Sequence, residues 1–95
     1  MSMKIVFLDG ERIASMDALH AAFGTALDLP EYYGKNLDAL HDCLTDIPDD
    51  VGVIAVNTEA LASHLGRRWK GFLRLMRELP EEKPNFRFLL DPFAE

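Results

Sequence analysis

Val51-Gly52-Val53-Ile54-Ala55-Val56 constrains the fold of this 95-residue chain more than any other stretch. Four of these six residues are β-branched, which is typical of β-strands. The run contains no polar side chain, so it lacks the apolar–polar alternation of a strand with one solvated face. The pattern therefore predicts a strand that is buried on both faces, as in a parallel sheet.

The segments on either side of this strand alternate between strand and helix patterns. Residues 4–8 and 86–90 are short apolar runs, and each predicts a further strand. Between the strands, apolar residues recur at three- and four-residue spacing, which predicts helices. These helices cover about residues 16–27, 37–44, 58–65 and 69–79, and Pro80 is expected to end the last one.

Strands that are separated by helices pair in parallel through crossover connections. We therefore expect an α/β fold, a three-stranded parallel sheet packed with about four helices. The length suits one core, so residues 1–95 are expected to form a single domain, and a monomer is the default.

Charge and cysteine content narrow the classes of partner and the compartment. The net charge of −6 argues against direct binding to nucleic acid or to an anionic membrane, and it favours a basic partner. The lone Cys43 allows no internal disulfide, and the four apolar residues after Lys4 are too few for a secretory signal. These features predict a cytoplasmic protein, although modest negative charge also serves solubility alone.

The chain carries no motif that indicates catalysis. Its glycines lack the spacing of a phosphate-binding loop, and His20, His41 and His64 lack the spacing of metal ligands. His41 and Cys43 lie two residues apart on a predicted helix, so their side chains point about 200° apart and do not meet. We expect no enzyme activity, no metal and no cofactor. A small hydrolase formed by distant residues is the weakest alternative.

The helix predicted over residues 37–44 has an acidic edge. With Leu37 as the reference direction, Asp38 and Asp42 lie at about 100° and 140° around the axis, one turn apart. Like charges at this spacing destabilise a helix slightly, so the pair is either a solvated face or a ridge that meets cations on a partner. Tyr32 and Tyr33 precede the ridge, and tyrosine is common at interfaces. At least one of these rings is expected to pack under its loop.

Residues 29–45 resemble the signature of the barstar family. This segment reads Leu29-Pro30-Glu31-Tyr32-Tyr33-Gly34-Lys35-Asn36-Leu37-Asp38-Ala39-Leu40-His41-Asp42-Cys43-Leu44-Thr45. The family has Tyr-Tyr-Gly, Asn-Leu-Asp-Ala-Leu, and Asp followed by Leu-Thr at these intervals. Weaker similarity extends over about residues 3 to 90. The resemblance implies a three-stranded parallel sheet with four helices, and an inhibitor that blocks the active site of a basic, barnase-type ribonuclease or a related nuclease toxin.

The resemblance also implies roles for particular residues. Asp42 would be the central carboxylate, in the place of a substrate phosphate, and Asp38 would be the second acidic contact. Tyr32 would pack against the catalytic histidine of the enzyme. The remaining contacts implied by the family are Asn36, Leu37, Thr45 and, from the last helix, Glu78.

His41 is also expected to lie at the partner-binding surface, but it departs from the family pattern, because the best-known member has a large aromatic residue there. A protonated imidazole beside two aspartates would partly neutralise the ridge. This change leaves open a second function, a non-catalytic regulatory or interaction domain on the barstar scaffold that binds another basic protein.

Overall fold

The computed structural model describes residues 3–92, and these form a three-stranded sheet with four helices. The strands are β1 (Met3–Asp9), β2 (Asp50–Val56) and β3 (Phe86–Leu90). The helices are α1 (Met16–Leu27), α2 (Leu37–Asp46), α3 (Thr58–Leu65) and α4 (Arg68–Glu82). The expected α/β fold is confirmed.

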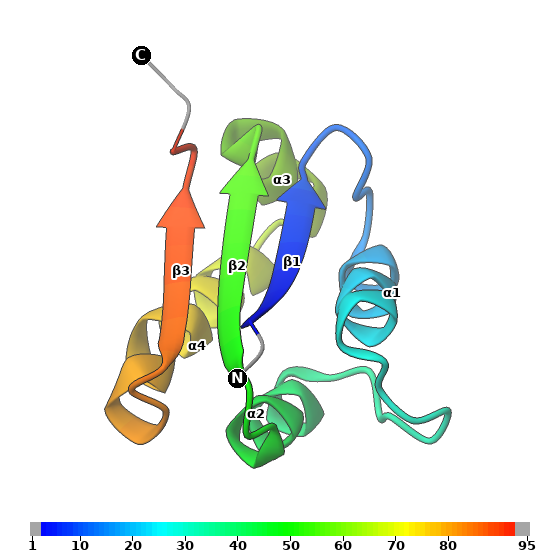
Figure 1. Ribbon diagram of the computed structural model, residues 1–95. Coiled ribbons are helices and arrows are strands. Elements are labelled where there is room, and N and C mark those ends of the chain that lie inside the picture. The colour runs from blue at the N-terminus through cyan, green and yellow to red at the C-terminus, as the bar shows by residue number, and fades with distance from the viewer. Residues whose placement is uncertain (1–2, 93–95) are drawn as a thin grey trace.

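The sheet is parallel throughout, with β2 between β1 and β3. Val6 pairs with Val53 in register, and Val53 pairs with Phe88. The chain therefore enters every strand at one end of the sheet and leaves at the other, and the connections contain the helices (Figure 1). This order places α2 near the end where the strands begin and α3 near the end where they finish.

The core lies between the sheet and the helices. Strand residues such as Val6, Leu8 and Val53 are fully buried there, and Phe72 of α4 is at its centre. The ring of Phe72 makes edge-to-face contacts with Phe23 of α1, at a centroid distance of 6.0 Å, and with Phe88 of β3, at 6.1 Å. These aromatic contacts join two helices to the sheet.

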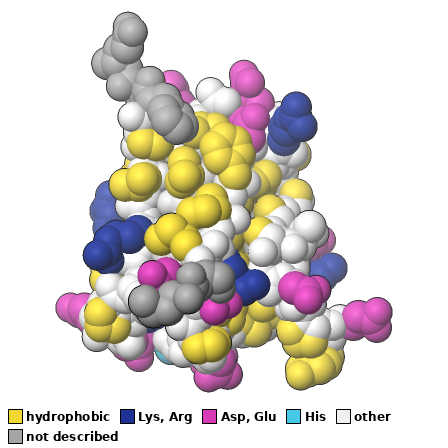
Figure 2. Space-filling view, viewed as in Figure 1, with side chains coloured by type: hydrophobic (Ala, Val, Ile, Leu, Met, Phe, Trp, Pro, Cys, Tyr) yellow, Lys and Arg dark blue, Asp and Glu magenta, His cyan; other side chains and the backbone are white. Residues whose placement is uncertain are grey.

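Within residues 3–92, no helix covers the opposite face of the sheet, so the prediction that the central strand is buried on both faces holds only in part. On the helix side of β2, Val51, Val53 and Ala55 are fully buried, whereas Ile54 and Val56 on the other side are only partly buried. In Figure 1 the helices lie behind the sheet and beside it, and apolar side chains cover the face turned to the viewer in Figure 2. The exposed apolar residues on this face are Met3, Ile5, Phe7 and Leu89. On β2, Gly52 is buried because the Ile5 side chain lies over it, so neighbouring side chains replace a second layer.

The last helix continues past Pro80, which corrects the prediction that this proline ends it. Pro80 lies in the final turn, where a missing N–H removes one hydrogen bond and interrupts no long run. The helix ends at Glu82, and the N–H of the next residue, Lys83, donates to the carbonyl of Leu79 at 2.8 Å. Glu81 and Glu82 are therefore part of the helix.

Candidate functional site

The predicted site is built on α2 and on the loop of residues 30–36 that leads into it. Asn36 is the N-cap, with an extended backbone, and its side-chain oxygen accepts from the N–H of Ala39 at 2.8 Å. Its side-chain amide also donates to the carbonyl of Gly34 at 3.3 Å. One residue therefore fixes both the start of α2 and the end of the loop. Asn36 directly precedes the first apolar residue of the helix, which is the position typical of an N-cap.

The core-facing side of α2 holds the helix in place. Leu40 and Leu44 are fully buried. Leu37 is half-buried and packs against α4, where a Cβ added at Gly71 would lie 3.2 Å from the Leu37 Cδ1 atom. The absence of a side chain at Gly71 lets the two helices approach there. Packing and capping together give α2 a fixed orientation before any partner binds.

Asp38 and Asp42 lie one turn apart on α2, and both side chains are exposed. The Asp42 side chain is 79 % accessible. Tyr32 is 89 % exposed, whereas the neighbouring Tyr33 is buried, which confirms that one of the two rings packs beneath the loop. We call Tyr32, Asp38 and Asp42 the acidic surface.

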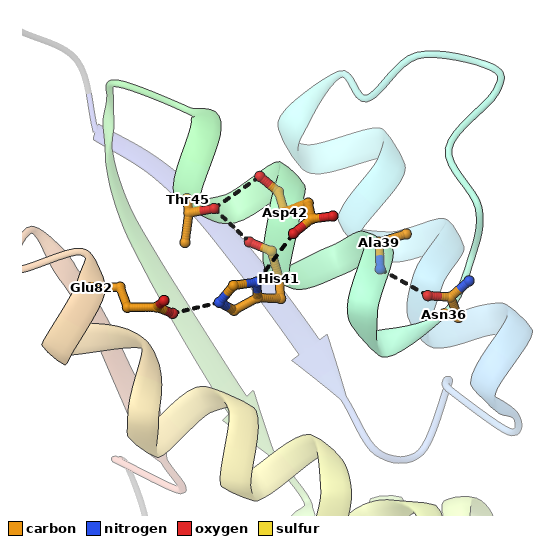
Figure 3. Close-up of polar contacts among 6 residues, drawn as sticks. All are labelled: Asn36, Ala39, His41, Asp42, Thr45 and Glu82. Atoms are coloured by element: carbon orange, nitrogen blue, oxygen red, sulfur yellow. Dashed lines mark hydrogen bonds and ion pairs between the residues drawn. The ribbon is translucent and has the colours of Figure 1, made fainter.

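His41 connects the acidic surface to α4. Its Nε2 atom is paired with the carboxylate of Glu82, and its Nδ1 atom lies 3.3 Å from Oδ1 of Asp42 (Figure 3). These two carboxylates raise the pKa of His41, with Glu82 making the larger contribution. The imidazole is therefore more readily protonated than an isolated histidine, and when protonated it places a positive charge at the side of the acidic surface.

Glu82 is the residue of this cluster that the sequence did not reveal. It lies 41 positions from His41 along the chain, and only the packing of α2 against α4 brings the two together. The α4 acid that was predicted from the family is Glu78, one turn earlier. Glu78 is exposed, and within residues 3–92 no hydrogen bond or ion pair joins it to α2.

Thr45 and Lys83 complete the region around α2. The Thr45 hydroxyl lies 3.0 Å from the carbonyl of His41 and 3.1 Å from that of Asp42, so it donates back into its own helix (Figure 3). Lys83 is buried, and its Nζ atom donates to the carbonyl of Ile47 at 2.6 Å. This bond attaches the end of α4 to Ile47, the C-cap residue of α2.

The site is an open surface of the molecule. Asn36, Leu37 and Asp38 line a hollow of about 480 Å³ together with Arg68. A larger hollow, of about 1020 Å³, lies between Glu11, α3, α4 and the end of β3, and it contains none of the predicted site residues. An exposed helix edge of this kind suits contact with another macromolecule better than enclosure of a small ligand.

The described residues show no arrangement typical of catalysis or metal binding. Residues 3–92 contain no cluster of three or more His, Cys, Asp or Glu side chains that could hold a metal ion. Burial raises the pKa of the Cys43 thiol, which disfavours the reactive thiolate, and His41 pairs with carboxylates. In the same part of the chain, no helix is long and apolar enough to cross a bilayer.

Comparisons with known proteins agree with this architecture. The family model described as Barstar (barnase inhibitor) matches residues 3–91. The chain is also 34 % identical over 93 residues to a Bacillus subtilis (strain 168) protein named "Putative ribonuclease inhibitor YrdF", and the match covers 94 % of this chain and all of that protein. A family match over nearly the whole length, on three parallel strands and four helices, leads to one conclusion: this chain belongs to the barstar family.

Proposed function

We propose that this protein inhibits a basic ribonuclease of the barnase type, or a related nuclease toxin, by covering its active site with the acidic surface. The observation that carries the proposal is the pair of exposed carboxylates, Asp38 and Asp42, on a helix that is already capped and packed. A ribonuclease active site is built to bind the anionic phosphate of RNA. A carboxylate held rigidly in that place satisfies the same cations and offers no bond to cleave.

The remaining site residues have supporting roles in this proposal. Asp42 is the central anion and Asp38 the second, while Tyr32 provides exposed aromatic area against the catalytic histidine of the enzyme. Asn36, Leu37 and Thr45 form the contact surface around them, and Glu78 adds negative charge from α4. The net charge of −6 further attracts a basic partner over a distance of several ångströms.

His41 distinguishes this acidic surface from one with an aromatic residue at the same position. Its ring is held between Glu82 and Asp42, so it cannot turn freely toward a partner. Its positive charge, when protonated, offsets part of the negative charge of Asp42. We propose that this residue tunes which basic enzyme is recognised.

The test is a titration of the protein into a barnase-type ribonuclease while RNA cleavage is followed. Wild-type protein is expected to abolish cleavage at a stoichiometric ratio. Asp42→Ala is expected to raise the inhibition constant at least about 30-fold, because cations of the enzyme are left buried without a partner. Its melting temperature should stay close to that of the wild type, since Asp42 is exposed.

Glu59→Ala is the matched control. It removes one exposed carboxylate from the first turn of α3, near the opposite end of the sheet, so it changes the net charge equally. It is expected to inhibit like the wild type. Equal weakening by both variants would show that only net charge matters. If micromolar wild-type protein leaves cleavage unchanged, the proposal fails for this enzyme class, and recovery of another basic protein would favour the regulatory domain.

A further inference from the structure

A buried polar pair lies directly beneath the loop of residues 30–36. His20 of α1 is 1 % exposed and Tyr33 of the loop is 9 % exposed. The His20 Nδ1 atom and the Tyr33 hydroxyl oxygen are 2.6 Å apart, which is a short hydrogen bond between side chains 13 positions apart. The two rings also meet edge to face, with a centroid distance of 5.6 Å.

This bond attaches the loop to the body of the protein. The other hydrogen bonds of residues 30–36 are local, for example from the N–H of Tyr33 to the carbonyl of Pro30 and from Asn36 to Gly34. Hollows of about 340 and 480 Å³ flank the pair, and His20 and Lys35 line both of them. Because the loop is poorly supported on either side, its position depends strongly on the Tyr33 ring.

Burial favours the neutral form of both partners. Burial lowers the pKa of His20, against a smaller opposing effect of Asp17, and Lys35 lowers it further. Burial also raises the pKa of Tyr33 well above its usual value. Removal of either hydrogen-bonding group leaves the other one buried without a partner, which lowers the stability of the folded protein.

Tyr32, which is 89 % exposed, precedes the buried Tyr33 directly, so the backbone that holds one ring under the loop also fixes the other outside it. We infer that His20 and Tyr33 are positioning residues, which hold the loop so that Tyr32 is presented in a fixed place to the enzyme. This inference rests on the proposed function. A loop that is ordered before binding loses less conformational entropy on association, so affinity is gained without any new contact.

The first test uses the free protein and needs no ribonuclease. Backbone ¹⁵N order parameters are measured for wild type, Tyr33→Phe and Tyr32→Phe. Tyr33→Phe is expected to lower the order parameters of residues 31–36 from about 0.85 to below about 0.6, while those of α2 stay unchanged. Tyr32→Phe removes the same hydroxyl group one residue away, at an exposed position, and should leave the loop ordered. Wild-type order in the loop of Tyr33→Phe would overturn the inference.

The second test measures whether the pair acts through Tyr32. Tyr33→Phe is expected to weaken ribonuclease binding about 10-fold, and again about 10-fold in an Asp42→Ala background, because independent sites add. In a Tyr32→Ala background, Tyr33→Phe is expected to weaken binding less than about 2-fold, because the Tyr32 ring that the pair positions is absent. Equal losses in both backgrounds would overturn the inference.

A third variant separates positioning from simple stability. His20→Leu combined with Tyr33→Phe fills the buried space with apolar groups and removes both polar partners, so the melting temperature should recover toward the wild type. The inference requires that the loop stays mobile and binding stays weak in this variant. Binding that recovers together with stability would overturn it. A wild-type protein that does not bind the ribonuclease contradicts the proposed function, while the order parameters still decide whether the pair holds the loop.

Discussion

The acidic surface and the uncovered face of the sheet are both exposed, but they are built in opposite ways. Asp38 and Asp42 project from a helix whose opposite side is buried through Leu40 and Leu44. The uncovered face consists of alternate residues of strands whose other residues, such as Leu8, form the core. Side chains on the helix edge can therefore change without disturbing the packing, whereas those on the sheet face also shelter the sheet itself, as Ile5 shelters Gly52.

The largest expected effect is on the free energy of unfolding, when leucines on the two faces of the sheet are replaced. Leu8 and Leu89 are the same residue type on the same sheet, but Leu8 is fully buried and Leu89 is 49 % exposed. Leu8→Ala is expected to lower the free energy of unfolding by about 3 kcal/mol, since it leaves a cavity. Leu89→Ala is expected to lower it by less than about 1.5 kcal/mol, because half of this side chain is already in water. Urea denaturation of both variants measures the difference.

Equal losses for the two leucine variants would contradict the view that this face is open. Sedimentation of the wild-type protein is the accompanying control, because a monomer is expected. Equal losses together with a dimer would show that a second copy covers the face in solution.

The helices that carry the site were predictable because their signals are local. Asn36 reads as an N-cap from its position before Leu37, and the spacing of Leu40 and Leu44 gives the buried side of α2. The same reasoning placed Asp42 on the exposed edge. Each of these features depends on residues within one or two helical turns, so the sequence alone contains the necessary information.

The uncovered sheet face could not be predicted, because it does not depend on local signals. The sequence of an apolar strand has the same pattern whether a second layer of helices or only neighbouring side chains cover the strand. Which of these covers it depends on how all the helices and strands are arranged. The pairing of His41 with Glu82 likewise depends on how α2 packs against α4. The end of α4 was also not predictable, because the spacing of apolar residues after Trp69 does not show that the last turn of the helix tolerates Pro80.

Asp38 should affect binding and leave stability nearly unchanged, in contrast to the sheet residues. Asp38→Ala is expected to weaken ribonuclease inhibition about 10-fold, corresponding to the loss of one charge-assisted contact. Its stability should change by less than about 0.5 kcal/mol, because the lost attraction to the helix dipole is offset by reduced repulsion from Asp42.

Leu89→Ala serves as the control for Asp38→Ala, measured in the same inhibition assay and by the same denaturation. It is expected to show the reverse pattern, with lower stability and unchanged inhibition. If Leu89→Ala weakened inhibition as much as Asp38→Ala, the division between a binding surface and a structural face would be wrong.

The smallest expected effect is the pH dependence that His41 gives to stability. Glu82 and Asp42 raise the pKa of His41 in the folded protein above its ordinary value of 6.5. Protonated His41 therefore stabilises the folded state, fully at pH values below the unfolded pKa, and this contribution is lost as the pH rises through the higher folded pKa. The imidazole is 35 % and the Glu82 side chain 58 % accessible, so solvent limits the contribution to less than about 1 kcal/mol.

Glu82→Gln isolates this contribution, because it keeps the shape of the side chain and removes its charge. The stability difference between wild type and Glu82→Gln is expected to be largest near about pH 5.5, where His41 is protonated in both states, and to shrink toward about pH 8.5. Glu78→Gln is the control, because Glu78 lies one turn earlier on the same helix and, within residues 3–92, has no hydrogen-bond or ion-pair partner on α2. This variant should differ from the wild type equally at both pH values. A Glu82→Gln difference of the same size at both pH values would mean that His41 is neutral where it meets Glu82, and that the hydrogen bond between α2 and α4 carries no charge on the imidazole.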